Sequence, residues 1–389
     1  MVFALRCCVT LVSTLLVLSP LSALGACPGQ TLPALPADPT VPRWPVGYRT
    51  LPGAFTARNL TLGVWYPARP PSANAVQCSW DLREHMPPKQ ARKIPDSASP
   101  QPPYDNCFFG LPLDDAFGPY PLAIFVHGTA GFRTQSAHLC THLASRGFVV
   151  IAADYPGIQL YDMLNKADHP LQPGPEEDQA GDTRLLHEML KKMSDPRLAF
   201  LQNTTDPANN AILGHSAGGF ALKGLGDIAK VLVPMAASGI DNVSATGAPM
   251  RLQSSLVLGA TNDSVTGGLA AQGPGYNASP TPKRLAMVRD LGHHFCSDLC
   301  WIGADDGGIV AIALRHGILV AAALKGLAND GCHFANPAFA LPELGWRFNH
   351  YAASVVLEGE LMCDANATAK MRNIGNAIDD TALYREMLP

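Results

Sequence analysis

The sequence predicts a doubly wound α/β fold in which most strands of the sheet are parallel. Two runs, residues 121–126 and 147–153, are almost wholly apolar, and a segment of helical length, residues 135–145, lies between them. Strands of this kind are buried on both faces, as in a parallel sheet covered by helices. With 389 residues, of which 47% are hydrophobic, the chain can bury a large core as one domain.

The alternation of strands and helices continues toward the C-terminus. Further strands are expected at residues 211–213, 231–234, 255–258 and 285–288. Further helices are expected at residues 182–193 and from Ala217 to about Ala229. The stretch 154–180, with its Pro and Gly residues, is expected to be a loop over the carboxyl ends of the strands, where such folds bind ligands.

Two segments interrupt this alternation. A strand expected at residues 59–66 is followed by residues 68–120, a Pro-rich segment with little periodicity that indicates a long surface insert. Residues 296–346 form a second insert, which contains cysteines. We therefore expect one domain, residues 41–389, that carries both inserts.

The second insert contains the most apolar stretch of the C-terminal half, residues 308–327. Arg315, His316 and Lys325 interrupt it, and a charged side chain near the centre of a bilayer would cost roughly 2.5 to 3.5 kcal/mol. This stretch is therefore expected to be a buried helix.

The N-terminus predicts a secreted protein. Residues 1–25 have the order typical of a signal peptide, because Arg6 precedes an apolar stretch and small residues follow it. A lipoprotein with an acyl group on Cys27 is the alternative. Glycosylation is supported by Asn-x-Ser/Thr sequons at Asn59, Asn203, Asn242, Asn262, Asn277 and Asn366.

Cysteines predict disulfides, since secretion would expose an even number of them to an oxidising compartment. The favoured pairs are Cys300 with Cys332 and Cys78 with Cys107. A zinc site within residues 293–333 is the rival hypothesis, but the Cys and His spacings there fit no closed zinc pattern. We therefore expect neither a metal ion nor another cofactor.

The charge balance argues against a nucleic-acid partner. The chain has 28 Lys and Arg against 32 Asp and Glu, a net charge of −4, and no long basic run. Binding to phosphates needs a basic patch. Nothing in the sequence indicates an obligate protein partner.

A Gly-His-Ser-Ala-Gly motif at residues 214–218 joins a predicted strand directly to a predicted helix. In this setting the pattern G-x-S-x-G places its serine on a sharp turn. Ser216 is therefore expected to project outward as a nucleophile, with room supplied by Gly214 and Gly218. A helix that begins at Ala217 would also direct its positive end at the reacting centre.

A neutral serine needs a base that accepts its proton and a carboxylate that orients the base. Asp263 follows one predicted strand and is the preferred acid, while Asp241 after the preceding strand is the alternative. His293 follows the next strand and is the preferred base. The adjacent His294 is expected to have a packing or capping role.

The oxyanion formed during acyl transfer needs two backbone amides directed at it beforehand. Ala217, directly after the nucleophile, supplies one of them. The sharp turn at residues 127–131, His-Gly-Thr-Ala-Gly, is expected to supply the other from Thr129.

Together these motifs resemble the secreted platelet-activating-factor acetylhydrolases and their bacterial polyester-hydrolase and dienelactone-hydrolase-like relatives. The residues that carry the resemblance are 64–68, 127–134, 143–150, 214–219 and 292–295. The resemblance implies an α/β-hydrolase fold and metal-independent hydrolysis of carboxylic esters. It also implies a catalytic triad of Ser216, Asp263 and His293, with Thr129 and Ala217 as oxyanion donors.

Several substrates are compatible with this resemblance. We expect a small-molecule or lipid ester, favour short or oxidised acyl groups, and expect contact with a membrane surface where the substrate is a lipid. The elbow is also similar to that of chlorophyllases. Polyester hydrolysis is disfavoured, because residues 237–253 contain no Trp to clamp an aromatic ring. A catalytically inactive hydrolase fold that serves as an extracellular binding module is a further alternative.

Overall fold

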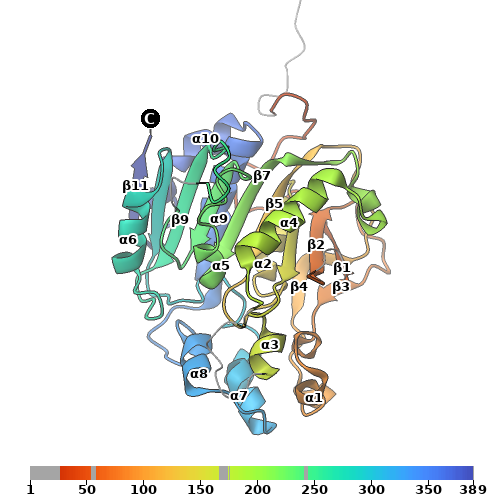
Figure 1. Cartoon of the computed structure of the whole chain (residues 1–389), viewed down its shortest axis with the longest axis vertical. Coiled ribbons are helices and arrows are strands. Elements are labelled where there is room, and N and C mark those ends of the chain that lie inside the picture. Colours follow the sequence, from red (N-terminus) through yellow and green to blue (C-terminus); the bar gives the residue numbers. More distant parts are fainter. Residues whose placement is uncertain (1–26, 54–57, 166–173, 175, 241–243, 389) are drawn as a thin grey trace, which may run out of the picture.

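The computed structural model describes residues 27–53, 58–165, 174, 176–240 and 244–388, which form an open sheet with helices on both faces (Figure 1). The strands are β1 (Val46–Leu51), β2 (Thr61–Pro67), β3 (Gln77–Ser79), β4 (Pro103–Phe109), β5 (Tyr120–Val126), β6 (Val149–Asp154), β7 (Thr205–His215), β8 (Val231–Met235), β9 (Ser254–Ala260), β10 (Lys283–Val288) and β11 (Thr381–Met387). Their order across the sheet is β11-β10-β9-β8-β7-β5-β6-β2-β1-β4-β3.

The central strands confirm the predicted doubly wound, mostly parallel architecture. Strands β6, β5, β7, β8, β9 and β10 run parallel to their neighbours, whereas β2 is antiparallel to β6 and β11 is antiparallel to β10. The α-helices are α1 (Pro88–Ala91), α2 (Ala137–Ser145), α3 (Leu160–Asn165), α4 (Gln179–Lys192), α5 (Ala217–Phe220), α6 (Leu269–Ala278), α7 (Gly308–Arg315), α8 (Ala322–Asn329), α9 (Pro342–Leu361), α10 (Ala365–Met371) and α11 (Ile374–Ala377). Short 3₁₀ helices are η1 (Leu82–His85), η2 (Asp96–Ala98), η3 (Pro196–Leu201) and η4 (Ala304–Asp306).

Burial on both faces explains the continuous apolar runs of the central strands. In β5, Ala123 and Phe125 belong to the core that α2 and α9 cover. Leu122 and Ile124 belong to the opposite core, which includes apolar residues of α4 and η3. Because both sides of β5 are covered, its sequence shows no polar alternation.

Two helix predictions are wrong, and glycine explains the second. The helix expected from Ala217 to about Ala229 ends at Phe220, and turns follow, with Gly224 at a φ of 77°. The helix expected at residues 308–327 is divided into α7 and α8, because Gly317 adopts a φ of 67° just after α7. Glycine readily adopts this left-handed conformation, which ends a helix.

The Pro-rich insert contributes to the sheet, which its sequence did not indicate. Strand β4 pairs in parallel with β1, and β3 pairs antiparallel with β4. The helices of this insert lie with α3, α7 and α8 at the same end of the sheet (Figure 1). The two inserts thus meet over one end of the strands.

Disulfides join distant parts of the chain. The favoured pairs Cys78–Cys107 and Cys300–Cys332 are confirmed, and Cys27–Cys363 is a further disulfide. The alternative of an acylated Cys27 is wrong, because its sulfur is bonded to Cys363. The segment expected to be a signal peptide lies outside the described residues. Three disulfides are typical of a protein that folds in an oxidising compartment.

Not all the remaining cysteines pair. Cys140 and Cys296 are buried free thiols. Burial raises the pKa of both thiols well above its usual value. They therefore pack as small apolar side chains.

None of the helices in the described ranges is long and apolar enough to cross a membrane. The long helix α9 instead packs on the sheet, with Phe348, Ala352 and Val356 fully buried.

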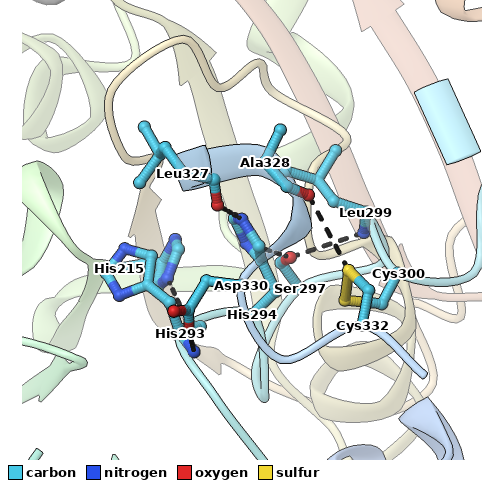
Figure 2. The surroundings of a disulfide bond; sticks show 10 residues. All are labelled: His215, His293, His294, Ser297, Leu299, Cys300, Leu327, Ala328, Asp330 and Cys332. Atoms are coloured by element: carbon cyan, nitrogen blue, oxygen red, sulfur yellow. Dashed lines mark hydrogen bonds between the residues drawn. A yellow bond between two sulfur atoms is a disulfide. The ribbon is translucent and has the colours of Figure 1, made fainter. Parts of the chain in front are cut away.

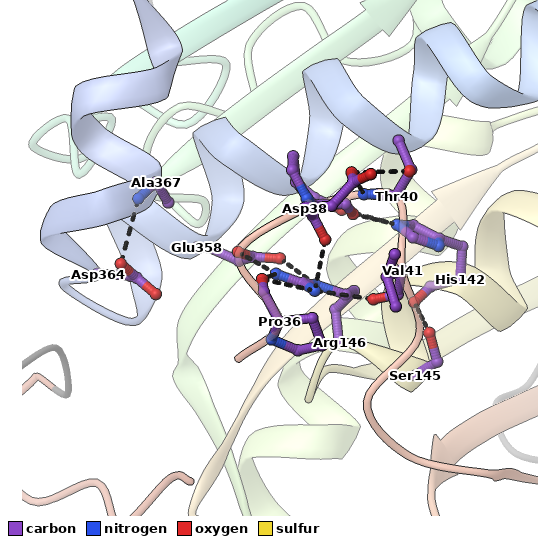
Figure 3. Close-up of polar contacts among 12 residues, drawn as sticks. Pro36, Asp38, Thr40, Val41, His142, Ser145, Arg146, Glu358, Asp364 and Ala367 are labelled. Carbon is purple, nitrogen blue, oxygen red and sulfur yellow. Dashed lines mark hydrogen bonds and ion pairs between the residues drawn. The ribbon is translucent and has the colours of Figure 1, made fainter. Parts of the chain in front are cut away.

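A buried ion pair fixes α2 to α9 (Figure 3). Arg146, just after α2, donates from Nε to Oε1 of Glu358 over 2.6 Å and from Nη2 to Oε2 over 2.8 Å. Both side chains are at most 2% exposed. Nη1 of Arg146 also donates to the carbonyl oxygen of Val41 over 2.8 Å. The pair therefore ties the N-terminal segment and two helices together.

Candidate active site

Ser216 lies on the sharp turn between β7 and α5. Its φ of 55° and ψ of −121° belong to a region that costs a non-glycine residue about 1 to 3 kcal/mol. The turn is held by a hydrogen bond from the Ser216 amide to the carbonyl oxygen of Met235, at 2.9 Å. Strain of this kind persists where the surrounding structure imposes it, and it is typical of functional sites.

The glycines of the elbow are needed because backbones approach each other closely. A Cβ atom on Gly214 would lie 2.3 Å from the carbonyl oxygen of Gly218, and one on Gly218 would lie 2.3 Å from that of Val126. Both contacts are too short for any side chain. The elbow therefore packs directly against the end of β5, and Gly214 and Gly218 supply the room that was expected of them.

The loop after β5 brings Thr129 beside the elbow. A Cβ atom on Gly128 would lie 3.0 Å from the Cβ of Ser216, so the two turns touch. Within the described part of the chain, the amides of Thr129 and Ala217 donate no hydrogen bond. Both amides are therefore free to donate hydrogen bonds to a negatively charged oxygen.

His293 and Asp263 meet as the sequence predicted. Nδ1 of His293 lies 3.1 Å from Oδ2 and 3.2 Å from Oδ1 of Asp263, and both side chains are fully buried. Burial alone would raise the pKa of Asp263, but the hydrogen bond from His293 and the hydroxyl and amide of Thr266 outweigh it and lower the pKa to about 2. The carboxylate therefore stays ionised and fixes Nδ1 as the protonated nitrogen.

The other ring nitrogen of His293 is left without a partner. Nε2 is buried and forms no hydrogen bond to any described residue, including the hydroxyl of Ser216. With the proton on Nδ1, Nε2 can accept a proton. Hydrogen bonds between catalytic groups are often long in the absence of substrate.

His215 and Gln135 hold the elbow against the base, and sequence reasoning missed both. Nε2 of Gln135 donates to Nδ1 of His215 over 2.8 Å, and Nε2 of His215 donates to the carbonyl oxygen of His293 over 3.0 Å. Burial lowers the pKa of His215 well below its usual value, so its ring is neutral. Oε1 of Gln135 also accepts from the amide of Gly128. Together the side chains of Gln135 and His215 connect the loop after β5, the elbow and the loop of His293.

Asp330 connects the loops of the acid and the base, and it too was missed (Figure 2). Its Oδ1 accepts from the amide of His293 over 2.7 Å, and its Oδ2 accepts from the hydroxyl of Ser264. Asp330 belongs to the second insert, two residues before Cys332. Such a contact arises only in the folded chain, so no local motif could indicate it.

The alternatives for the site fare differently. Asp241, the alternative acid, lies outside the described residues. His294 caps as expected, because its ring bonds the hydroxyl of Ser297 and the carbonyl oxygen of Leu327. The zinc hypothesis loses two ligands to the Cys300–Cys332 disulfide, and no cluster suited to a metal ion occurs in the ranges that the structure covers.

The lowered pKa of Asp263 predicts a loss of stability in acid. An unfolded aspartate has a pKa of about 3.9, so the unfolded chain binds this proton more readily than the folded one. The ionised Asp263 therefore adds about 2 kcal/mol to the free energy of unfolding. This contribution is complete above about pH 4 and is lost as the pH falls toward 2. Denaturant unfolding from about pH 5 to pH 2 should show the free-energy difference between wild type and Asp263→Asn shrinking by this amount. A constant difference would contradict the assignment.

The sheet order, the elbow at the end of β7 and the loops beside it define an α/β-hydrolase fold. Residues 105–157 match the family model of platelet-activating factor acetylhydrolase, isoform II. The match spans β5, the turn with Thr129, α2 and β6, and confirms the resemblance over this segment. It supports a hydrolase of the lipase or esterase type. A search of curated proteins gave no match.

Proposed function

We propose that the protein is a secreted serine hydrolase of carboxylic esters. The observation that carries the proposal is the pair of His293 and Asp263, with Nε2 of His293 left unpaired. The ring of His293 lies 4.7 Å, centroid to centroid, from that of His215, the residue before Ser216. The oxyanion also needs hydrogen-bond donors. The backbone amides of Thr129 and Ala217, which have no partner in the described chain, can supply them. The family match and the disulfides support the same reading.

In the proposed reaction, Nε2 of His293 accepts the proton of Ser216 as the hydroxyl attacks the ester carbonyl. The amides of Thr129 and Ala217 stabilise the oxyanion. His293 then donates the proton to the departing alcohol, which leaves an acyl group on Ser216. Water, activated by the same histidine, releases the acid and regenerates the serine.

Labelling with a fluorophosphonate tests this proposal, because the reagent modifies only an activated serine. The intact, disulfide-bonded protein should incorporate one label per chain, on the peptide that contains Ser216, and an ester substrate should slow the labelling. An inactive hydrolase fold that acts as a binding module would show no labelling. That result would overturn the proposed function.

Asp330 is proposed as a positioning residue for His293. Asp330→Ala removes the acceptor for the His293 amide, and a misplacement of about 1 Å can cost roughly 100-fold in rate. We expect kcat to fall about 10- to 100-fold with KM within about twofold. Asp330→Asn keeps one acceptor and should recover part of the rate.

Ser264→Ala is the matched control for Asp330, since it removes the hydrogen bond to Oδ2 of Asp330 and leaves the acceptor for the His293 amide in place. Its kcat should fall less than that of Asp330→Ala. A lowered melting temperature with unchanged kcat in Asp330→Ala would show that the residue is structural alone.

A further inference from the structure

An apolar pocket lies between the two inserts at the end of the sheet. Residues of the first insert, such as Met86 and Ile94, form one wall. Residues of α7 and α8, such as Ile312 and Leu324, form another, and Leu164 of α3 closes a third side. We call this space the cap pocket.

The cap pocket adjoins the proposed active site through two loops. Thr129 and Ala130, from the oxyanion turn, line it, and the preceding Gly128 touches Ser216. His294, next to the proposed base, also lines it. A group bound to Ser216 therefore has the cap pocket as a neighbouring space.

The lining can accept only an uncharged, apolar group. Among the residues that the structure describes, no charged side chain lines the pocket, and its few polar residues include His294. Burial, with His293 nearby, lowers the pKa of His294 to about 3, so this ring is neutral. Both of its nitrogens are already engaged by Ser297 and Leu327. Each methylene buried against such a wall contributes about 0.8 kcal/mol.

Contacts between the two inserts hold the walls of the cap pocket in place. Met86 and Ile94 pack with Ile312 and Ile318 in a small core of their own. Lys93 donates from Nζ to the carbonyl oxygen of Gly317 over 2.8 Å. The Cys300–Cys332 disulfide closes the segment that carries α7 and α8 (Figure 2). The pocket is thus formed before any ligand binds.

We propose that the cap pocket binds the unmodified aliphatic acyl chain of the ester. This inference rests on the proposed function. A carbonyl oxygen held by the amide of Thr129 places the attached acyl chain beside Thr129 and Ala130, which form the pocket wall. The departing alcohol instead faces Nε2 of His293, whose side chain does not line the pocket. The cap pocket therefore selects for the acid part of the substrate.

The proposal revises the expected substrate class. The sequence favoured short or oxidised acyl groups. A short chain would leave the cap pocket unfilled, and an oxidised chain would bury a polar group without a partner, at a cost of about 1 to 3 kcal/mol. Esters of medium-length, unoxidised fatty acids fit the lining better.

Filling the pocket with a larger side chain tests the proposal. Ala328 of α8 lines the cap pocket, whereas Ala323 on the same helix is exposed and lies outside the lining. The substrates are 4-nitrophenyl octanoate and 4-nitrophenyl acetate, which share an alcohol. Ala328→Phe should lower kcat/KM for the octanoate at least tenfold and change the acetate value less than twofold. Ala323→Phe should change neither.

Two further measurements keep the outcome decisive. Leu327→Trp also reduces the pocket and replaces Ala328→Phe if that variant does not fold. An unchanged octanoate-to-acetate ratio in a folded variant would overturn the proposal. So would selective loss of activity on octyl acetate relative to ethyl acetate, because the pocket would then hold the alcohol.

Binding separates this proposal from the proposed function. Calorimetry with ethyl octanoate on Ser216→Ala should show binding that the added Ala328→Phe substitution weakens at least tenfold. This result stands even if the wild-type protein hydrolyses no ester and takes up no fluorophosphonate. Absence of binding in both proteins would overturn the cap-pocket assignment while leaving the labelling result as the test of catalysis.

Discussion

Replacing Ser216 by alanine should lower kcat for ester hydrolysis by about 10⁶-fold and abolish fluorophosphonate labelling. The hydroxyl is the only atom that can form the proposed acyl-enzyme, and removal of the serine from such a triad costs roughly this factor. The free energy of unfolding should change little, because the strained backbone and the contacts of Gly214 and Gly218 stay in place. Steady-state kinetics and denaturant unfolding measure the two quantities.

Ser72→Ala is the control for this prediction. Ser72 is exposed in the first insert, and its replacement should leave kcat and labelling unchanged. If Ser216→Ala kept activity within about tenfold of wild type, hydrolysis would have to proceed through another group, and the role assigned to Ser216 would be wrong.

Replacing Glu358 by glutamine should lower the free energy of unfolding by about 3 kcal/mol. The substitution keeps the volume of the side chain but leaves the charge of Arg146 buried without a counter-ion. Breaking a buried ion pair in this way costs about 3 to 5 kcal/mol. Urea or guanidinium unfolding at neutral pH measures the difference.

Glu188→Gln is the matched control, because it breaks an exposed pair. Glu188 and Lys191 lie 2.9 Å apart on α4, and their side chains are 48% and 41% exposed. The loss there should be at most about 0.5 kcal/mol. The double variant Arg146→Met, Glu358→Leu should recover most of the stability that Glu358→Gln loses. If Glu358→Gln and Glu188→Gln lowered the free energy of unfolding equally, burial would not be the reason for the effect at Glu358.

Parts of the fold that depend on local sequence could be predicted. Strands β5 and β6 and helix α2 follow from unbroken apolar runs around a helix-length segment. The elbow at Ser216 follows from glycines that must lie where backbones touch. Asp263 and His293 could be proposed together because both follow parallel strands, whose carboxyl ends share one edge of the sheet.

Parts that depend on contacts between distant segments could not be predicted. Gln135 and Asp330 resemble ordinary polar residues in the sequence, and their links to His215 and His293 exist only after folding. Strand β11 was missed for a related reason. Buried and exposed residues alternate over only part of this strand, so its sequence carries no clear alternation of apolar and polar residues. Its extended conformation depends on pairing with β10.

The length of α5 shows how tertiary structure limits a local pattern. An apolar segment after the elbow predicted a long helix, but after Phe220 the chain continues in tighter turns, in which the amide of Leu222 donates to the carbonyl oxygen of Gly219. A helix of four residues has only a small dipole, so α5 contributes little positive potential at the reacting centre. The free amide of Ala217 depends only on the turn and is unaffected.

The Cys300–Cys332 disulfide encloses the most exposed apolar residue between α7 and α8, Leu319, which is 92% exposed. A protease that cuts the chain after Leu319 therefore separates no fragment, because this bridge and Cys27–Cys363 both cross the cut. On a gel without thiol the nicked protein migrates as one band, and only reductant resolves two. Such a cut would loosen the wall of the cap pocket that α7 and α8 form, while the disulfides keep the two fragments joined.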